Sequence, residues 1–394
     1  MRKIAIYTGN RAEYGLQFPI IKAVTEHPEL ADYLLISGAH LDDDFGKTRA
    51  EIEKDGFRIH REIPIEMGDD TVFGTARAIG SGVLNLSVAL QELRPDVLVV
   101  YADRFEGFAA VIAGTQMNIP TAHIEGGDVT EGGALDDSVR HAMTKLSHIH
   151  FTTNEEAAER VRRMGEESWR VFNVGFPAID LIEQGNFATP AEIEDRFGVT
   201  REAPFIVFTQ HSVTTEFELA VKQVEAGLQA LERLAEDGIK VILTYPNNDA
   251  GGRAIVNRIV EWYGQGRENV QLHRSVGRYA YHGLLHLGGN GGGNGVCVGN
   301  SSSGIKETPA LGCPAVNIGS RQQKRLRGEN VLDVDYKAAE IEAAIRRCLE
   351  DDELRRRARE GHNPYGKGGA GKKIAEVLAT ISLDSNLLRK RMTL

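Results

Sequence analysis

The segment from residue 123 to residue 145 holds acidic, basic and glycine residues at a density that suggests proton transfer. A largely apolar run leads into a glycine-rich loop, and a helix is expected to begin at Asp136 and Asp137. Residues four apart share one face of such a helix, which pairs Asp136 with Arg140. In the ordinary alternative, Asp136 only caps the helix and Glu125 is a solvated loop acid. The groups that could do chemistry here are Glu125, Asp128, Asp136, Asp137, His123, His141 and Arg140.

Chain length and charge limit the class of protein. A chain of 394 residues exceeds what one hydrophobic core usually supports, so two domains are expected. The formal net charge of −10 argues against broad binding to nucleic acids or anionic membranes. It is compatible with a local basic pocket for a small anion.

Three features of the sequence favour a cytoplasmic protein. The chain enters a strand-like run at once, without a charged and apolar leader. No apolar run approaches the roughly 20 residues needed to span a bilayer. The three cysteines, Cys297, Cys313 and Cys348, have no metal-ligand spacing and cannot all pair, which favours a reducing compartment.

Short apolar runs alternate with amphipathic helical patterns along the whole chain, which predicts an α/β protein with parallel sheets. The first series of strands ends near residue 174, and the pattern restarts after residue 200. Two such units would face one another across a cleft. The glycine-rich run Leu287 to Gly295 is expected to be a mobile surface loop.

Polar residues recur just past the carboxyl ends of the predicted strands, where open parallel sheets bind their ligands. Taken singly, each has an ordinary explanation: Asp103 as a helix cap, Arg11 as a surface cation, or His211 as a loop histidine with its hydrogen bonds satisfied. Together they predict a ligand site. The residues in these places are Arg11, His40, Asp103, Glu125, His211, Asn247, Ser301 and Arg321.

The run from residue 300 to residue 307 predicts a phosphate site. Small hydroxyl residues and Gly304 are expected to open a helix, whose free N–H groups and dipole attract anions. Glu307 could accept hydrogen bonds from ribose, and Arg11 and His211 could add positive charge. The pattern suggests a nucleoside diphosphate without a metal. The acidic runs 42–44 and 69–70 are interpreted as solvated loops, and neither Gly-Lys-Ser/Thr nor Gly-x-Gly-x-x-Gly occurs in the first strand-to-helix turn.

The order of the motifs resembles the hydrolysing UDP-N-acetylglucosamine 2-epimerases of sialic acid and related nonulosonic acid biosynthesis. Asp103-Arg104 and Asp136-Asp137 resemble the hydrolysing branch of that group. The motifs are Gly9 to Tyr14, Gly38 to Leu41, Asp103 to Glu106, His123 to Gly127, Asp136 to His141, Tyr245 to Asn247, Gly299 to Gly304, Gly319 to Gln322, Gly328 to Asn330 and Asn363 to Gly366.

This resemblance implies a GT-B fold with two Rossmann-like domains whose parallel sheets face an interdomain cleft. Residues 1–180 would carry the catalytic carboxylates, residues 195–364 would bind UDP, and a helix within 365–394 would pack back on the first domain. Homodimers or homotetramers are expected, with no cofactor. The implied catalytic residues are Asp103, Glu125, Asp136 and Asp137, and the implied substrate contacts are Arg11, His40, Arg104, Arg140, His211, Asn247, Ser301, Ser302, Glu307 and Arg321.

The implied reaction converts UDP-N-acetylglucosamine and water to N-acetylmannosamine and UDP. The same chemistry on UDP-2,4-diacetamido-2,4,6-trideoxyglucose, on the legionaminic acid route, is an alternative that the motifs do not separate. A GT-B glycosyltransferase is a further alternative. A nucleotide-sugar-binding regulator without catalysis is disfavoured by the cluster of Asp103, Glu125 and Asp136.

Overall fold

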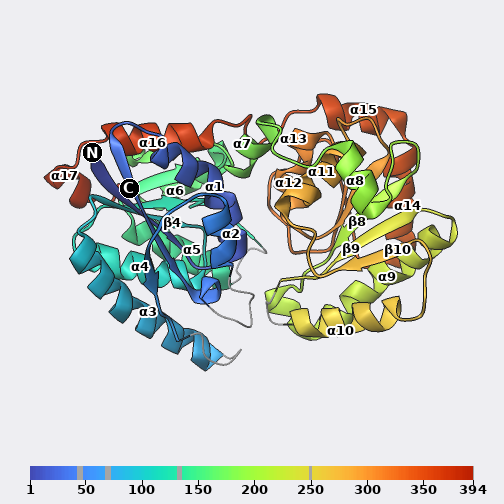
Figure 1. The fold of residues 1–394 in the computed structure, drawn as a ribbon, viewed down its shortest axis with the longest axis horizontal. Coiled ribbons are helices and arrows are strands. Elements are labelled where there is room, and N and C mark those ends of the chain that lie inside the picture. Colours follow the sequence, from blue (N-terminus) through green and yellow to red (C-terminus); the bar gives the residue numbers. More distant parts are fainter. Residues whose placement is uncertain (42–47, 67–71, 131–134, 248–250, 394) are drawn as a thin grey trace. The chain divides into compact units, whose positions relative to one another are not determined.

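The structure is a computed structural model that describes residues 1–41, 48–66, 72–130, 135–247 and 251–393. The acidic runs at 42–44 and 69–70 lie outside these residues. The chain forms two compact units (Figure 1). Unit 1 comprises Met1–Asp128, Leu135–Asp180 and Tyr365–Leu394, and unit 2 comprises Val129–Ala134 and Leu181–Pro364.

Unit 1 is built on a seven-stranded parallel sheet in the order β3-β2-β1-β4-β5-β6-β7. The direction of strand addition reverses between β1 and β4, the position at which open α/β sheets place their ligands. The strands are β1 (Arg2–Thr8), β2 (Leu30–Ser37), β3 (Ile59–Ile63), β4 (Val97–Tyr101), β5 (Thr121–Ile124), β6 (Ile149–Thr152) and β7 (Val171–Asn173).

Helices cover both faces of this sheet because its central strands are apolar on both sides. Every residue of β4 and β5 is buried. The α-helices of this part of the chain are α1 (Arg11–Thr25), α2 (Arg49–Lys54), α3 (Val72–Leu93), α4 (Phe105–Gln116), α5 (Leu135–Leu146), α6 (Glu155–Arg163), α7 (Ala178–Glu183, at the boundary between the units), α16 (Ala370–Thr380) and α17 (Ser385–Leu388).

The C-terminal segment belongs to unit 1. Helix α16, near the red end of the chain, lies against α1, near the blue end (Figure 1). Ile374 and Leu378 are fully buried in the same core as Ile20 and Val24. The Asp180 carboxylate accepts hydrogen bonds from the first two N–H groups of α16, at 2.9 and 2.8 Å, which fixes where that helix begins.

Unit 2 repeats the architecture with six parallel strands in the order β10-β9-β8-β11-β12-β13. Its reversal lies between β8 and β11. The strands are β8 (Phe205–Thr209), β9 (Lys240–Thr244), β10 (Val270–His273), β11 (Gly295–Gly299), β12 (Ala315–Ile318) and β13 (Val331–Val334), and the α-helices are α8 (Pro190–Phe197), α9 (Ala220–Glu236), α10 (Gly252–Tyr263), α11 (Arg278–Gly288), α12 (Ser303–Lys306), α13 (Thr308–Leu311), α14 (Ala338–Glu350) and α15 (Asp352–Glu360).

The glycine-rich run from Leu287 to Gly295 is not the mobile surface loop that the sequence predicts. Helix α11 extends through Gly288, and the following residues form a hydrogen-bonded turn into β11. The Arg355 guanidinium donates to the carbonyl oxygens of Gly288 and Gly293 at 2.9 and 2.6 Å. A side chain at Gly289 would collide with the Leu311 carbonyl, with a Cβ to O distance of 2.2 Å. Gly289 therefore serves close packing.

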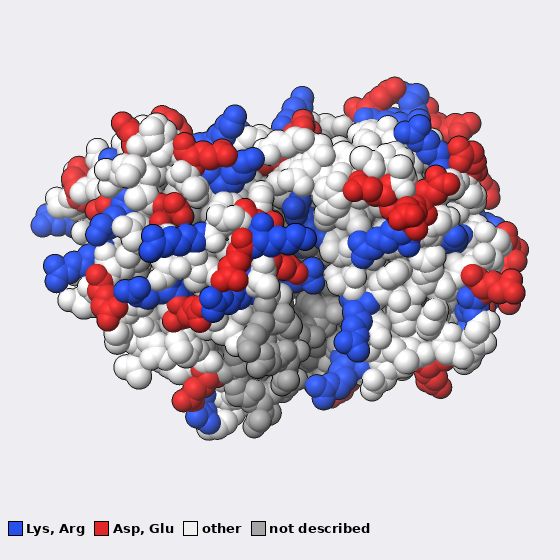
Figure 2. Space-filling model, in the orientation of Figure 1, with Lys and Arg blue, Asp and Glu red and all other residues white. Residues whose placement is uncertain are grey.

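Basic and acidic side chains are interspersed over the face shown in Figure 2. Many of them form surface ion pairs, such as Arg49 with Glu53 at 3.0 Å and Arg233 with Glu342 at 3.0 Å. Exposed pairs of this kind contribute little to stability. No helix among the described residues is long and apolar enough to cross a membrane.

Replacing Ile374 by Ala should lower the free energy of unfolding by about 2–5 kcal/mol, because it leaves a cavity where α16 packs on unit 1. The midpoint of thermal unfolding measures this effect. Leu383→Ala, at a side chain that is 37% exposed, is the control and should change the midpoint little. Equal midpoints for the two variants would contradict the assignment of α16 to the core.

Candidate active site

The centre of the site residues in unit 1 is the buried side chain of Arg140, which is 2% exposed. One terminal nitrogen donates to Asp137 Oδ1 at 2.6 Å and to the Asp128 carbonyl oxygen at 3.0 Å. The other terminal nitrogen donates to Asp103 Oδ2. A single guanidinium thus joins α5 to the loop that follows β4 and makes charge-assisted hydrogen bonds to two carboxylates.

Two residues that follow neighbouring strands have left-handed backbone conformations, which residues other than glycine rarely adopt. Ala102, before Asp103, has a φ of 54°, and Glu125 has a φ of 68°. The Ala102 N–H donates to the Ile124 carbonyl at 2.9 Å, and the Glu125 N–H donates to the Phe151 carbonyl at 2.8 Å. Such conformations persist only where the surroundings hold them, and they cluster at functional sites.

The Glu125 side chain is 5% exposed and lies beside Tyr101. Burial and the adjacent Glu125 carboxylate raise the pKa of Tyr101 well above its usual value. The phenol therefore stays protonated. On α5, Asp136 is half-buried in the first turn, while Asp137 is buried against Arg140.

The remaining predicted residues of unit 1 have different environments. Arg11 is exposed and paired with Glu51 at 2.9 Å. Arg104 is partly exposed, and its Nε lies 3.5 Å from buried Glu106. His40 is fully buried, with Nδ1 2.6 Å from Thr48 Oγ1 and Nε2 3.2 Å from Thr8 Oγ1. Here His40 holds the segment after β2 and does not lie at the surface for a ligand.

In unit 2, Asn300 brings several predicted residues together after β8 and β11. Its side-chain oxygen accepts the His211 N–H at 2.6 Å, and its side-chain nitrogen donates to the His211 carbonyl at 2.8 Å. The Asn247 N–H donates to His211 Nδ1 at 3.0 Å. Arg321 donates to the Asn300 carbonyl at 3.3 Å. His211, Asn247 and Arg321 therefore lie close to one another around Asn300.

His211 is a neutral donor, and the expectation that it adds positive charge is wrong. Burial and the nearby Arg321 guanidinium lower the pKa of His211 to about 3. Because Nδ1 accepts the Asn247 N–H, the ring proton resides on Nε2. His211 can therefore donate one hydrogen bond through Nε2, while Arg321 supplies the positive charge.

The predicted phosphate-binding helix after Ser301 is also corrected by the structure. The segment forms two single-turn helices, α12 and α13, that meet at Glu307, because Pro309 has no N–H to continue a longer helix. A helix of a single turn has only a small dipole with which to attract a phosphate. Ser301 Oγ lies 2.9 Å from Ser303 Oγ, while Ser302 is half-buried at the start of α12. Glu307 Oε2 lies 3.0 Å from His282 Nε2.

The sequence does not indicate a specific role for His123, Asn300 or His282. Asn300 directly follows β11, so the strand-end rule that singled out Ser301 applied to it equally. Nothing in the sequence connects His282, on α11, with Glu307. His123 belongs to a family motif, but the motif does not reveal which groups its ring contacts.

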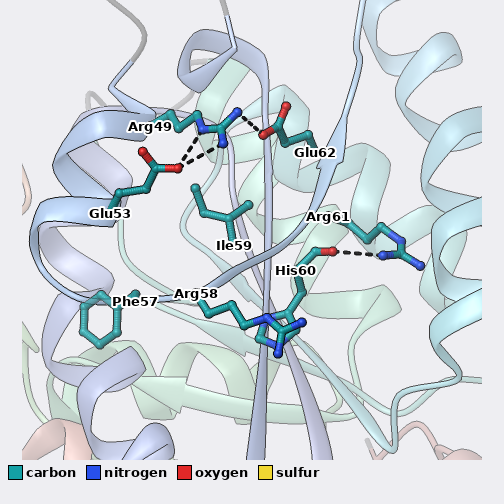
Figure 3. Close-up of a pocket in the computed structure, with 8 residues that line it drawn as sticks. All are labelled: Arg49, Glu53, Phe57, Arg58, Ile59, His60, Arg61 and Glu62. Atoms are coloured by element: carbon teal, nitrogen blue, oxygen red, sulfur yellow. Dashed lines mark hydrogen bonds and ion pairs between the residues drawn. The ribbon is translucent and has the colours of Figure 1, made fainter.

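A surface hollow of about 500 Å³ lies along edge strand β3 and contains none of the predicted site residues (Figure 3). Arg49 lies between Glu53 and Glu62, which bind its guanidinium. The hollow is separate from the carboxylate cluster around Arg140. Among the described residues, no group of three or more His, Cys, Asp or Glu side chains could hold a metal ion.

Comparison with known proteins gives a decisive match. A family model described as UDP-N-acetylglucosamine 2-epimerase matches residues 22–379. The chain belongs to the UDP-N-acetylglucosamine 2-epimerase family. The family predicted from the motifs is thereby confirmed.

Individual relatives match over most of the chain. The Legionella pneumophila protein named UDP-N,N'-diacetylbacillosamine 2-epimerase (hydrolyzing) is 33% identical over 390 residues, 99% of each chain. The Neisseria meningitidis protein named UDP-N-acetylglucosamine 2-epimerase is 29% identical over 348 residues, 88% of each chain. A crystal structure of UDP-GlcNAc 2-epimerase from Neisseria meningitidis bound to UDP-GlcNAc has a TM-score of 0.78 at 18% identity and covers 96% of this chain and 99% of that chain. The predicted GT-B fold is confirmed.

A buried carboxyl group lies beneath the turn after β1. Glu13 is 4% exposed, and its Oε2 accepts the Gly9 N–H at 2.8 Å. Burial and the adjacent Glu106 carboxylate raise the pKa of Glu13 to about 8, against the opposing effect of the Gly9 hydrogen bond. Glu13 is therefore mainly protonated in the folded chain at pH 7.

This raised pKa predicts a pH-dependent stabilisation by Glu13→Gln. Above pH 4.5 the unfolded chain loses the Glu13 proton, whereas the folded chain keeps it to about pH 8. The wild type therefore loses stability as pH rises through this window. The advantage of the variant should grow by about 1.4 kcal/mol per pH unit between pH 5 and 8, as measured by urea unfolding. The exposed-site control, Glu29→Gln, should show no such trend, and a pH-independent difference for Glu13→Gln would refute the prediction.

Proposed function

We propose that the protein is a hydrolysing 2-epimerase of a UDP-2-acetamido sugar, releasing UDP and the 2-epimeric free sugar. The observation that carries the proposal is the grouping of Asp103, Asp137 and Arg140 at the strand-order reversal of unit 1, with Glu125 after the next strand. Membership of the family supports the same reaction.

The proposed chemistry begins with an elimination. A base removes the proton from C2 of the sugar while the bond from C1 to the UDP oxygen breaks, and the electron pair of the C2–H bond forms the C1–C2 double bond of a 2-acetamidoglucal. Water then adds to C1, and C2 is reprotonated on the opposite face. UDP-N-acetylglucosamine and water thus give N-acetylmannosamine and UDP, with inversion at C2.

Protonation on opposite faces requires more than one acid–base group. We assign Asp103 and Glu125 to the proton transfers and to stabilising positive charge at C1, contributions on the order of 100- to 10,000-fold each. Asp136, half-buried on α5, would position the sugar or the water. Asp137 would act through Arg140, which it binds at 2.6 Å.

The proposed UDP contacts lie mainly in unit 2. The neutral His211 would donate from Nε2, and the Arg321 cation would stabilise charge on the departing diphosphate. Glu307 would accept from ribose hydroxyls beside His282. The full proposed set of substrate contacts is Arg11, Arg104, His211, Asn247, Ser301, Ser302, Glu307 and Arg321. The buried Arg140 and His40, predicted as contacts from the sequence, would act indirectly, Arg140 by holding Asp103 and His40 by holding its loop.

Two sugars are candidates for the substrate. UDP-N-acetylglucosamine is favoured by the name of the Neisseria meningitidis relative, and UDP-N,N'-diacetylbacillosamine, the 2,4-diacetamido-2,4,6-trideoxy sugar, by the name of the Legionella pneumophila relative. Of these two relatives, the Legionella pneumophila protein is the more similar in sequence, at 33% against 29% identity. Both sugars carry the 2-acetamido group and UDP that the proposed chemistry needs.

We also infer a homo-oligomer in the cytoplasm. Helix α3 exposes apolar side chains at Phe73, Leu84 and Val88, which are 70%, 67% and 56% exposed, and spacings of 4 and 11 residues place them on one face. A second copy of the chain would cover this face, as sedimentation equilibrium can test. The three cysteines are free and buried, in keeping with a reducing compartment.

The reaction can be tested by incubating the purified protein with each UDP-sugar in deuterated water without added metal. Proton NMR should show a free 2-epimeric sugar with deuterium at C2, together with UDP, because C2 exchanges its proton during elimination and hydration. A free sugar without deuterium would contradict the elimination. Intact UDP-sugars, or turnover that needs a sugar acceptor, would favour the glycosyltransferase alternative.

Replacing Asp103 by Asn should lower kcat by about 100-fold or more while UDP affinity stays near the wild-type value, because the carboxylate acts on the sugar. Initial rates and calorimetric titration with UDP measure the two quantities. Asp195→Asn, at an exposed residue of α8, is the control. Wild-type turnover in Asp103→Asn would remove Asp103 from the mechanism.

A further inference from the structure

His123 connects the three backbone segments that carry the proposed catalytic groups. It is fully buried in β5, two residues before Glu125. Its Nε2 lies 2.7 Å from the carbonyl oxygen of Ala102, the residue before Asp103. Its Nδ1 lies 3.1 Å from the hydroxyl of Thr144, which is one turn after Arg140 on α5. One imidazole therefore contacts the ends of β4 and β5 and the helix that carries Arg140.

The chemistry of the partners fixes the hydrogen atoms. A carbonyl oxygen can only accept, so Nε2 carries a proton and donates it to Ala102. Burial lowers the pKa of His123 to about 3, so the ring is neutral and Nδ1 is an acceptor. In a hydrogen bond between Nδ1 and Thr144, the hydroxyl is therefore the donor. The same hydroxyl also donates to the Arg140 carbonyl oxygen at 3.0 Å, so its single proton is shared between two acceptors.

The surrounding chain leaves space for this hydrogen bond. A Cβ at Gly126 would lie 2.8 Å from Thr144 Oγ1 and 3.0 Å from His123 Nδ1. Glycine at this position thus lets the hydroxyl and the ring meet. The Ala102 carbonyl that receives the other bond belongs to a residue with a φ of 54°, a conformation that needs support from its surroundings.

Burial alone does not give a histidine this role. His150 is the register partner of His123 on β6 and is equally buried. Its Nε2, however, lies 2.9 Å from Glu166, outside the proposed catalytic groups. The two histidines therefore differ in the hydrogen-bond partners of their rings and not in their burial.

We infer that His123 is a positioning residue that holds Asp103, Glu125 and Arg140 in register through its hydrogen bonds to Ala102 and Thr144. This inference rests on the proposed function, because it assigns His123 to the alignment of those groups. It predicts that breaking one hydrogen bond lowers turnover while the binding of UDP stays unchanged.

Thr144→Val tests the inference, because it keeps the shape of the side chain and removes the hydroxyl. The expected kcat is about 10- to 100-fold lower than in the wild type, since small displacements of reacting groups have effects of this order, with KM and UDP affinity little changed. Thr144→Ser restores a hydroxyl and should recover most of the activity. Thr152→Val, a fully buried threonine on β6, is the matched control and should keep wild-type kcat.

Gly126→Ala provides a second variant that pushes Thr144 and His123 apart without removing either, and it should lower kcat in the same direction. Wild-type kcat in Thr144→Val, or an equal loss in Thr152→Val, would overturn the inference. Failure of Thr144→Ser to recover activity would also overturn it.

Nitrogen NMR of labelled His123 tests the hydrogen bonds independently of activity. The wild type should show a protonated Nε2 and an unprotonated Nδ1 across pH 5 to 8, and Thr144→Val should shift the Nδ1 resonance. A proton on Nδ1 would overturn the assignment. If the wild type converts neither UDP-sugar, the proposed function fails and the catalytic role of His123 fails with it, whereas activity with an insensitive Thr144→Val variant refutes His123 alone.

Discussion

The buried guanidinium of Arg140 is the interaction on which the proposed active site depends. A charge that is 2% exposed is stable only if it is paired, and its partners come from three places in the chain: Asp103, Asp137 and the Asp128 carbonyl. Removing one of them would leave part of the hydrogen-bonding capacity of the buried guanidinium unsatisfied. The same contacts that satisfy Arg140 therefore fix the loops after β4 and β5 relative to α5.

In both units the chain turns sharply where the strand order of the sheet reverses. In unit 1 the chain turns sharply at Ala102, with a φ of 54°, before Asp103. In unit 2 the turn is at Gly299, with a φ of 126°, before Asn300. A Cβ at Gly299 would lie 1.9 Å from the Thr209 carbonyl, so only glycine fits there. Both turns direct polar residues to the carboxyl edge of a sheet, where ligands bind in this class of fold.

The end of the chain stabilises the helix that carries Arg140. The Lys390 ammonium donates to the carbonyl oxygens of Lys145 and Ser147, both at 2.7 Å, at the C-terminal end of α5. The last carbonyls of a helix generally have no partner within it, and a cation at that end also complements the helix dipole. Lys390 also pairs with Glu166 at 2.8 Å. Residues distant in sequence from the site thus help to hold α5.

The sequence by itself determined the alternation of strands and helices, the strand ends that carry polar residues and the family motifs, because buried parallel strands are continuous apolar runs. It missed β3, β10 and β13, which are edge strands with few buried residues and no such run. Only the tertiary structure decided that Arg140 joins Asp103 to Asp137, that His211 is neutral and that His123 links Ala102 to Thr144. Those properties depend on burial and on partners far away in the sequence, which local spacing does not encode.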